Sequence, residues 1–283
     1  MNTESYRFQL GSLAIYPLSD GSMNYPPGHL FANVPKAQIE GALRERALPV
    51  DCVTMAYTCL FVNTGEHRVL VDIGAGKMSP STGRLRHNLQ AAGIEPADVD
   101  TVVITHAHPA HVGGTLDDEG QPVYTNARYY LWQEEWEFWA SEAAFASASE
   151  RQVAIARANL EPIRDRLTLL DEEAEIVPGI GVLPAPGHTP GHTVVSVSSG
   201  SEVLLYIADT VLHPLHLEHP DWFSIYDIAP ERARASKRAI FDLAAETGAW
   251  VIGQHFSPFP SLGHVVKSGE GWQWRPFERI GTT

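Results

Sequence analysis

Three histidines that could bind metal ions, His106, His108 and His111, lie close together in the chain. They follow the apolar, β-branched residues 101–104, which are typical of a buried strand. Ligands of open α/β folds bind beyond the carboxyl ends of the strands, and imidazole suits zinc, iron, copper and nickel. The spacing therefore predicts a metal site at a strand end. The alternative is three unrelated loop histidines, because short motifs also occur by chance.

Three more candidate ligands follow predicted strands farther along the chain. His188 lies in a loop rich in Pro and Gly, residues 184–193, whose restricted backbone can hold one imidazole in place. Asp209 ends the apolar residues 204–208, and His255 ends another apolar segment. Alone, Asp209 would be interpreted as a turn or N-cap aspartate. Together with the histidines, it is interpreted as a ligand that bridges two ions.

In this order the residues resemble the motifs of the metallo-β-lactamase superfamily. Its members carry His-x-His-x-Asp-His, then Pro-Gly-His, then Asp and then His, each after a strand. The matching positions run from about residue 50 to the C-terminus and are Asp72 within residues 70–76, residues 106–111, His188, Asp209 and His255. The resemblance implies an α/β fold class with a four-layer αβ/βα sandwich, which we expect to form one domain over residues 1–283.

The resemblance also implies a role for each of these residues. The ligands expected for the first metal are His106, His108 and His188, and those expected for the second metal are His111 and His255. Asp209 would bridge the metals and is an expected catalytic residue, whereas Asp72 would orient ligands by hydrogen bonding. His192 lies outside the pattern and is interpreted as a loop or supporting histidine. The expected metal is zinc at two sites, with iron or manganese as alternatives.

Ala110 departs from the family pattern, which has an aspartate at this position. In the family that aspartate binds the second metal and can shuttle a proton, and a methyl group does neither. His111, Asp209 and His255 remain, and three protein ligands plus water still form a catalytic zinc site. We therefore expect a weakened second site and slow turnover. Ala110 is interpreted either as a natural variant or, slightly favoured because alanine is a usual disabling choice, as a deliberate replacement.

The C-terminal third narrows the resemblance. Its segments resemble the methyl parathion hydrolase-like branch, which includes phosphotriesterases, lactonases and arylesterases; they are residues 209–216, 219–222, 253–256, 263–265 and 271–274. The expected function is metal-dependent hydrolysis of a neutral ester, lactone or organophosphate triester. The alternatives are a non-hydrolytic binding or sensing protein on the same scaffold, and a di-iron enzyme of oxygen chemistry, since the same ligands suit iron.

A second histidine cluster, His213, His216 and His219, follows the bridging aspartate. These residues are interpreted first as surface or hydrogen-bonded loop histidines. The alternative is that His213 or His216 is a catalytic residue that stabilises or protonates a leaving group. Three aromatic residues are expected to wall the substrate pocket: Phe256, Phe259 and Trp222.

Residues 129–150 are rich in aromatic side chains and predict one amphipathic helix. Trp132, Trp136 and Trp139 would share one face of that helix. Core packing is favoured, because aromatic residues at helical spacing are usually buried. The alternative is a lid over the metals or a dimer contact.

The charge of the chain limits its partners. Its 283 residues include 34 acidic and 20 basic ones, a formal net charge of -14. Binding of nucleic acid needs a concentrated basic face, so a small neutral substrate is favoured instead. No segment approaches the roughly 18 apolar residues of a membrane span, and no signal-peptide pattern is found. We therefore expect a cytoplasmic protein that does not bind membranes, and a homodimer from the resemblance alone. Cys52 and Cys59 are expected to be buried thiols that form no disulfide.

Overall fold

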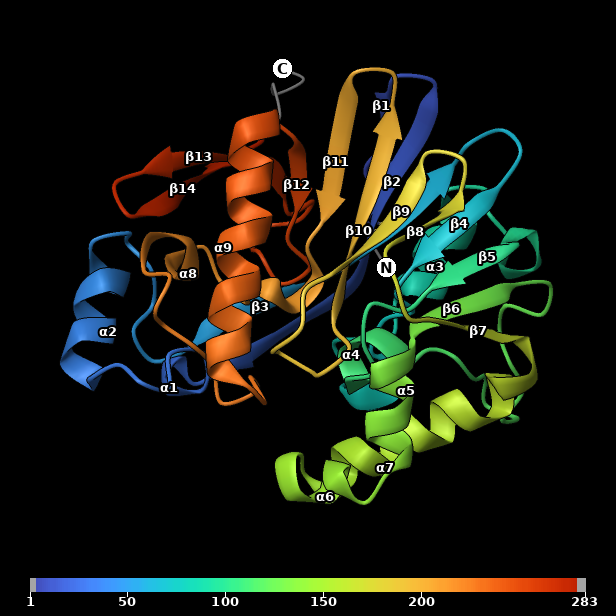
Figure 1. Ribbon diagram of the computed structural model, residues 1–283, viewed down its shortest axis with the longest axis horizontal. Coiled ribbons are helices and arrows are strands. Elements are labelled where there is room, and N and C mark those ends of the chain that lie inside the picture. Colours follow the sequence, from blue (N-terminus) through green and yellow to red (C-terminus); the bar gives the residue numbers. More distant parts are fainter. Residues whose placement is uncertain (1–3, 279–283) are drawn as a thin grey trace.

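Two sheets of seven strands pack face to face at the centre of the molecule (Figure 1). The computed structural model describes residues 4–278. The first sheet follows chain order and contains β1 (Phe8–Leu10), β2 (Leu13–Tyr25), β3 (Val53–Asn63), β4 (Arg68–Val71), β5 (Thr101–Val103), β6 (Arg128–Trp132) and β7 (Leu167–Leu170). The second runs in the reverse order, from β14 to β8, and contains β8 (Ala174–Val177), β9 (Ile180–Pro184), β10 (Thr193–Ser199), β11 (Glu202–Tyr206), β12 (Trp250–Ile252), β13 (Leu262–Ser268) and β14 (Gly271–Pro276).

Parallel strands bring several loops to one edge of the molecule. In the first sheet β4, β5, β6 and β7 are parallel, and in the second sheet β11 and β12 are parallel. The carboxyl ends of neighbouring parallel strands lie at the same edge of a sheet. Asp72 follows β4, His106 follows β5, Asp209 follows β11 and His255 follows β12, so the candidate ligands leave both sheets together.

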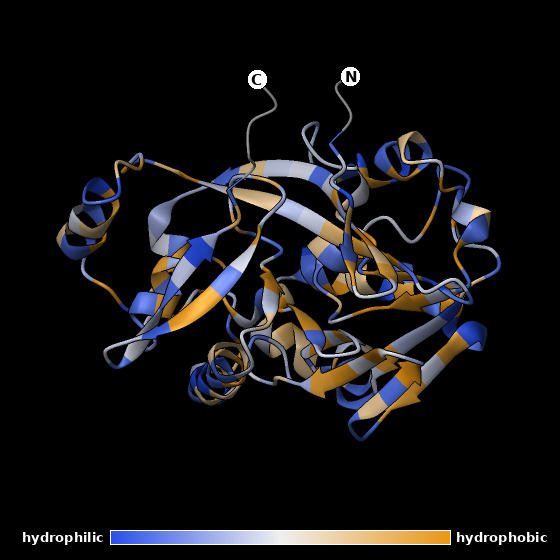
Figure 2. Ribbon diagram, turned by 90° about the horizontal axis from the view of Figure 1, so that it is seen from above, coloured by the Kyte–Doolittle hydropathy of each residue, from blue (hydrophilic) through white to orange (hydrophobic). Residues whose placement is uncertain are grey.

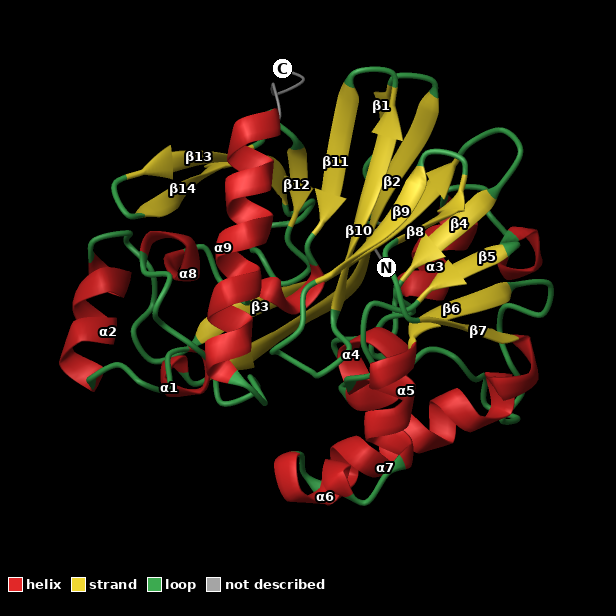
Figure 3. Cartoon of the chain, in the orientation of Figure 1, coloured by secondary structure: helices red, strands yellow, loops and turns green. Residues whose placement is uncertain are grey.

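Helices cover the outer face of each sheet (Figure 3). The first sheet is covered by α3 (Leu85–Ala91), α5 (Gln133–Ala140), α6 (Ala143–Ser147) and α7 (Glu150–Leu160), and the second by α9 (Pro230–Thr247). The remaining helices are short or peripheral: α1 (Pro27–Leu30), α2 (Lys36–Arg44), α4 (Pro109–Val112), α8 (Leu215–Glu218) and the 3₁₀ turns η1 (Gly76–Met78), η2 (Pro96–Asp98), η3 (Glu161–Arg166) and η4 (Ala208–Thr210). None of the helices within residues 4–278 combines the length and apolarity needed to cross a membrane.

Apolar residues fill the spaces between these layers, as the orange strands of Figure 2 indicate. Successive side chains of a strand point to opposite faces. Thus Val195 packs between the two sheets, whereas Val194 packs under α9. Leu204 and Leu205 of β11 divide in the same way. Strands with apolar residues on both faces are what a four-layer structure requires, and the predicted α/β sandwich is confirmed.

The predicted helix over residues 129–150 is wrong. Trp132 ends strand β6, and three separate helices, α5, α6 and α7, follow it. Trp136 and Trp139 both lie on α5, where Trp139 is buried and Trp136 packs against the same core. The aromatic residues therefore serve core packing. The predicted helix wrongly included the end of β6, because a short apolar strand and a helix have similar sequence patterns. Both cysteines are free thiols; the predicted burial is confirmed for Cys59 but is wrong for Cys52, which is half-buried.

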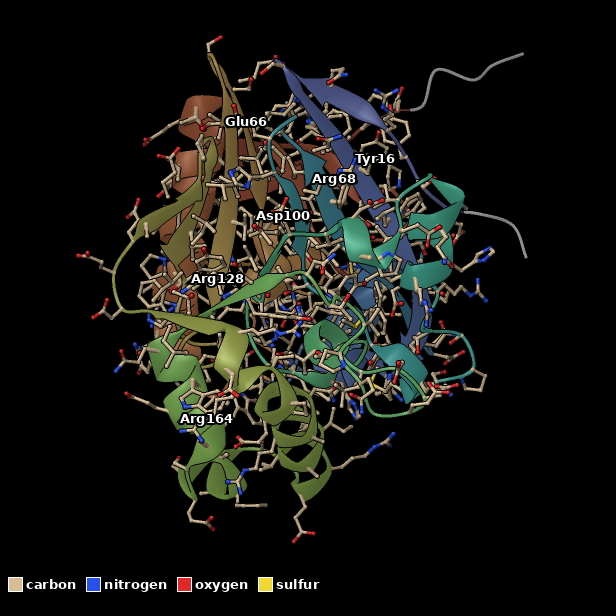
Figure 4. All side chains as sticks on the ribbon, turned by 90° about the vertical axis from the view of Figure 1, so that its right-hand side faces the viewer. Tyr16, Glu66, Arg68, Asp100, Arg128 and Arg164 are labelled. Atoms are coloured by element: carbon tan, nitrogen blue, oxygen red, sulfur yellow. The ribbon has the colours of Figure 1, made fainter. Side chains whose placement is uncertain are left out.

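Charged residues collect at the amino ends of the parallel strands, opposite the candidate ligands. Figure 4 shows Arg68, Asp100 and Arg128 on this side of the first sheet. Asp100 accepts a hydrogen bond from the backbone nitrogen of Arg68 at 2.8 Å, and its carbonyl accepts one from the backbone nitrogen of Arg128 at 2.9 Å. These contacts join the amino ends of β4, β5 and β6, so the candidate ligands lie at the opposite ends of these strands.

Candidate metal centre

Four buried side chains form a first donor cluster: His106, His108, His188 and Asp209. Nδ1 of His108 lies 3.1 Å from Nε2 of His106 and 2.9 Å from Nε2 of His188. Oδ2 of Asp209 lies 3.2 Å from Nε2 of His188. The donor atoms thus face one another, which is the arrangement that four-coordinate zinc requires.

A second donor cluster shares the same aspartate and contains His111, Asp209 and His255. Oδ1 of Asp209 lies 3.2 Å from Nε2 of His111 and 3.1 Å from Nε2 of His255. One oxygen of Asp209 therefore faces each cluster. The structure brings all six predicted ligands together and places Asp209 between the two groups.

Hydrogen bonds hold the far side of three of the ligand imidazoles, those of His111, His255 and His188. Nδ1 of His111 donates to Asp72 at 2.7 Å, and Nδ1 of His255 donates to the carbonyl of Ala56 at 2.8 Å. Nδ1 of His188 donates to Asp227 at 2.8 Å. Such outer partners fix the tautomer and the orientation of a ligating ring. Asp72 thus lies where it can orient His111 by hydrogen bonding.

His192 supports the aspartate rather than joining a cluster. Its Nε2 accepts a hydrogen bond from the backbone nitrogen of Asp209 at 3.1 Å, and its Nδ1 donates to the carbonyl of Ala185 at 3.1 Å. Both ring nitrogens are occupied, so none is left to bind a metal. The interpretation of His192 as a supporting histidine agrees with this geometry.

Two unpartnered atoms show that the clusters fit a metal. Nε2 of His111 and Oδ1 of Asp209 are buried and have no hydrogen-bond partner among the described residues. Buried polar atoms without a partner are rare in folded proteins. A cation placed between them would satisfy both, and the set of imidazole nitrogens with a carboxylate is the one that zinc or iron prefers.

The electrostatics of the clusters also favour a cation. Burial lowers the pKa of His106 and of His108 well below the usual value, so both rings are neutral and able to bind a metal. Burial alone would raise the pKa of Asp209, but His255 and His111 hold it well below the usual value. For His188 burial opposes charge, yet Asp209 and Asp227 raise its pKa to about 10.

A cavity of about 430 Å³ opens directly onto the donors. Its floor contains His108, His188, Asp209 and His255. Its walls are mostly apolar and come from segments that are far apart in the sequence: Met23, Tyr25, Met55, Tyr57, Met78, Leu212, Tyr226 and Ile155. The hydroxyl groups of Tyr25 and Tyr57 are hydrogen-bonded to each other. A small molecule with an apolar part fits this chemistry.

Ala110 lies on α4 and lines the same cavity. Its side chain packs at the edge of an apolar cluster that includes Met55 and Tyr57. Its carbonyl accepts a long hydrogen bond, 3.3 Å, from the side-chain amide of Gln254. The wall of the cavity beside the second cluster therefore carries a methyl group and no ligand atom at this position.

His213 and His216 lie outside the lining of this cavity. Nδ1 of His213 accepts a hydrogen bond from the backbone nitrogen of Leu215, and Nε2 of His216 donates to the carbonyl of Leu30. Both rings are buried against Phe31. This matches the interpretation as hydrogen-bonded loop histidines and gives no support to a catalytic role. His219 stacks on Trp222, with ring centroids 4.0 Å apart.

The three aromatic residues expected as pocket walls also lie elsewhere. Phe256 is 1% exposed and packs against Trp274. Trp222 packs against Phe31 and His219, and Phe259 is absent from the lining. The walls include residues of β2, β3 and α7 instead. The prediction of these pocket walls relied on closeness to a ligand in the sequence. It failed because a side chain that follows a strand can turn toward the core.

Sequence reasoning missed several residues of the centre. Asp227 holds His188, and Glu135 accepts hydrogen bonds from the loops of both His108 and His188. Neither lies in a recognisable motif, since each reaches the site only through tertiary packing. The one available signal for Glu135 was an acidic residue within an apolar aromatic segment.

Comparisons with known proteins agree with this architecture. The sequence model of the metallo-beta-lactamase superfamily matches residues 54–255. An N-acyl homoserine lactonase of Bacillus thuringiensis is 25% identical over 211 residues, which are 66% of this chain and 76% of that protein. An N-acyl homoserine lactonase of Bacillus sp is 23% identical over 181 residues, which are 56% of this chain and 66% of that protein.

Solved structures resemble the whole chain. The dizinc quorum-quenching lactonase AidC, in complex with a product, superposes with a TM-score of 0.93 at 29% identity and covers 99% of both chains. The hydrolase AbOPH superposes with a TM-score of 0.90 at 28% identity, over 99% of this chain and 100% of that one. Because the family match spans most of the sequence and carries both donor clusters, this chain belongs to the metallo-beta-lactamase superfamily of metal-dependent hydrolases.

Proposed function

We propose that the protein hydrolyses lactones that carry an apolar acyl chain, with zinc held by both donor clusters. The observation that carries the proposal is the position of the donors at the floor of a largely apolar cavity. A lactone ring would lie over the donors, and an acyl chain would contact the apolar walls. The lactonases among the similar proteins support the same substrate class.

The residues of the chain divide the work in this proposal. Bound zinc would polarise the lactone carbonyl and lower the pKa of a water molecule. Asp209 presents one oxygen to each cluster and so keeps the two sites at a fixed separation. The hydroxyl groups of Tyr25 and Tyr57 are hydrogen-bonded to each other, so one of their two hydrogens is used within the pair and the other can be donated to a carbonyl oxygen at the cavity wall.

Hydrolysis under controlled metal content tests this function. Purified protein is stripped with a chelator, reloaded with zinc, and assayed with an acyl homoserine lactone, an aryl ester and a phosphotriester. We expect lactone hydrolysis that disappears on stripping and returns with zinc, and that Asp209→Asn abolishes. Lactones left intact at saturating zinc, by this chain and by Ala110→Asp alike, would overturn the proposal. If the ester or the triester is hydrolysed faster than the lactone, the proposed substrate class changes to that compound.

Ala110→Asp tests the expectation of a weakened second site. A carboxylate at this wall of the cavity adds a fourth donor beside His111, Asp209 and His255, so we expect tighter binding of the second zinc and faster turnover. Zinc per chain, measured by plasma mass spectrometry after dialysis, and the lactonase rate are the two readouts. Ala110→Asn, which is similar in size but uncharged, is the control. A lower rate for Ala110→Asp would contradict this expectation and would mean that the site is adapted to alanine at this position.

The remaining expectations concern the surroundings of the enzyme. We infer a small neutral substrate, with no nucleic acid as a partner, from the acidic composition. A cytoplasmic location remains a prediction. A homodimer remains a prediction that sedimentation of the purified protein would test.

A further inference from the structure

Glu135 of α5 is a fully buried carboxylate outside both donor clusters. Its Oε1 accepts hydrogen bonds from the backbone nitrogen of Ala107 at 2.9 Å and from Nε1 of Trp139 at 2.6 Å. Its Oε2 accepts from the hydroxyl of Thr189 at 2.6 Å and from the backbone nitrogen of Gly191 at 3.0 Å. A buried charge is costly unless it is hydrogen-bonded, and these four bonds offset that cost.

Three of the four donors to Glu135 lie on the two loops that carry the histidines of the first cluster, and the fourth, Trp139, lies on α5 itself. Ala107 stands between two of these histidines, and Thr189 directly follows His188. Oε1 bonds to the loop after β5, and Oε2 bonds to the loop after β9. One carboxylate therefore spans the gap between the loops at the level of the ligands.

Close packing keeps this arrangement from adjusting. A Cβ atom on Gly191 would lie 2.3 Å from the backbone nitrogen of Glu135, so the second loop lies directly against α5. The same two loops are also joined where they meet the sheets, because the backbone nitrogen of Thr193 donates to the carbonyl of Thr105 at 3.0 Å. Glu135 adds a second point of attachment beside the histidines, and two points fix the relative orientation of the loops.

We propose that Glu135 is a positioning residue of the first metal site, which sets the separation between residues 106–108 and His188. Its carboxylate touches no donor atom of the cluster and acts through the backbone. Removing it would leave the backbone nitrogens of Ala107 and Gly191 buried without acceptors. The inference rests on the proposed function only for the identity of zinc as the metal.

Glu135→Gln is the sharpest test, because its side chain keeps the size but has one acceptor oxygen. The amide nitrogen would face the backbone N–H of Ala107 or of Gly191, so one of the two loops loses its backbone acceptor. The affinity for zinc is measured in a His255→Ala background, which leaves one complete donor cluster, by competition with a chromophoric chelator. We expect the zinc affinity to fall roughly 10- to 100-fold, the range found when hydrogen-bonding partners of metal ligands are mutated. The visible spectrum of bound Co²⁺ should change as well.

Two further variants separate positioning from general stability. Thr189→Val removes one of the four hydrogen bonds without changing the shape, and we expect a smaller loss of affinity than for Glu135→Gln. Asp20→Asn alters another buried carboxylate, which accepts from the backbone nitrogens of Ala75 and Leu85. Asp20→Asn should lower the unfolding temperature of the metal-free protein yet leave the zinc affinity and the Co²⁺ spectrum of the first site unchanged.

The outcomes distinguish this inference from the proposed function. Unchanged zinc affinity and Co²⁺ spectra in both Glu135→Gln and Thr189→Val would overturn the positioning role, whatever the activity. An equal loss in Asp20→Asn would also overturn it, since the effect would then follow stability alone. Reduced affinity in a protein that hydrolyses no lactone would support the positioning role and reject only the substrate class.

Discussion

Lys237 is a charged residue buried close to the outer partner of His188. It lies on α9, is 4% exposed, and donates hydrogen bonds to the carbonyls of Pro220 at 3.0 Å and Trp222 at 2.8 Å. Burial lowers the pKa of Lys237 to about 8, although Asp227 opposes this shift. The protein therefore holds an ammonium group near neutral pH at a cost in stability.

The cost predicts how stability depends on pH. The pKa of Lys237 is about 8 in the folded chain and near the ordinary value of 10.5 in the unfolded chain. Between these values the unfolded state binds more protons, so the contribution of Lys237 to the free energy of unfolding rises with pH. We expect the stability of the wild type relative to Lys237→Met to increase by roughly 3 kcal/mol between pH 8 and pH 10.5. Urea unfolding of both proteins at several pH values measures this, and a constant difference would contradict it.

At the scale of elements, the His188 loop depends on close contact with α9. Gly187 has a φ of +135°, and a Cβ atom there would lie 2.0 Å from the backbone nitrogen of Ala233. Gly200 also has a positive φ, +62°, but has open space around it. Of these two glycines, only Gly187 combines a φ that would strain a larger residue with a clash against another element.

This pair predicts two different penalties. Gly200→Ala should cost about 1–2 kcal/mol, the price of a left-handed conformation for a residue with a side chain. Gly187→Ala should cost at least about 2 kcal/mol more, because the loop must also move away from α9. Thermal and urea unfolding of the metal-free proteins give both values. Equal penalties would mean that the loop and α9 separate without cost.

The ligands that lie at strand ends are the part of the metal centre that the sequence could predict. His106, Asp209 and His255 each follow an apolar β-branched segment, and such segments fix both the strand and the residue that leaves it. Asp227 and Glu135 escaped prediction because each reaches the centre through packing of distant segments, which leaves no local pattern. The boundary between β6 and α5 escaped because Trp132 satisfies both periodicities.

On the scale of the whole molecule, the cavity lies between the β2 and β3 strands on one side and α7 on the other. Met55 lies on β3, whereas Gln152 and Ile155 lie on α7. The distance between these walls limits the width of a substrate. The proposed acyl chain would therefore be selected by packing against α7 rather than by the metal donors.

A larger side chain on α7 tests this selection. Ile155→Trp should narrow the cavity, so we expect the KM for long-chain acyl lactones to rise roughly tenfold or more, with a smaller effect on short chains. Ala154→Trp, on the exposed neighbouring position of the same helix, is the control and should leave KM unchanged. A uniform change in kcat for all chain lengths would contradict the assignment of this wall.

Each donor cluster draws its ligands from both sheets: His106, His108 and His111 follow strands of the first, while His188, Asp209 and His255 follow strands of the second. A bound cation would therefore crosslink two halves of the chain that meet at the exposed residues 171–173. If the backbone were cut there, zinc would bind the associated pair of fragments more tightly than either fragment alone. Association of the two polypeptides would then strengthen with zinc concentration by linkage, and the fragments would form a split reporter of free zinc.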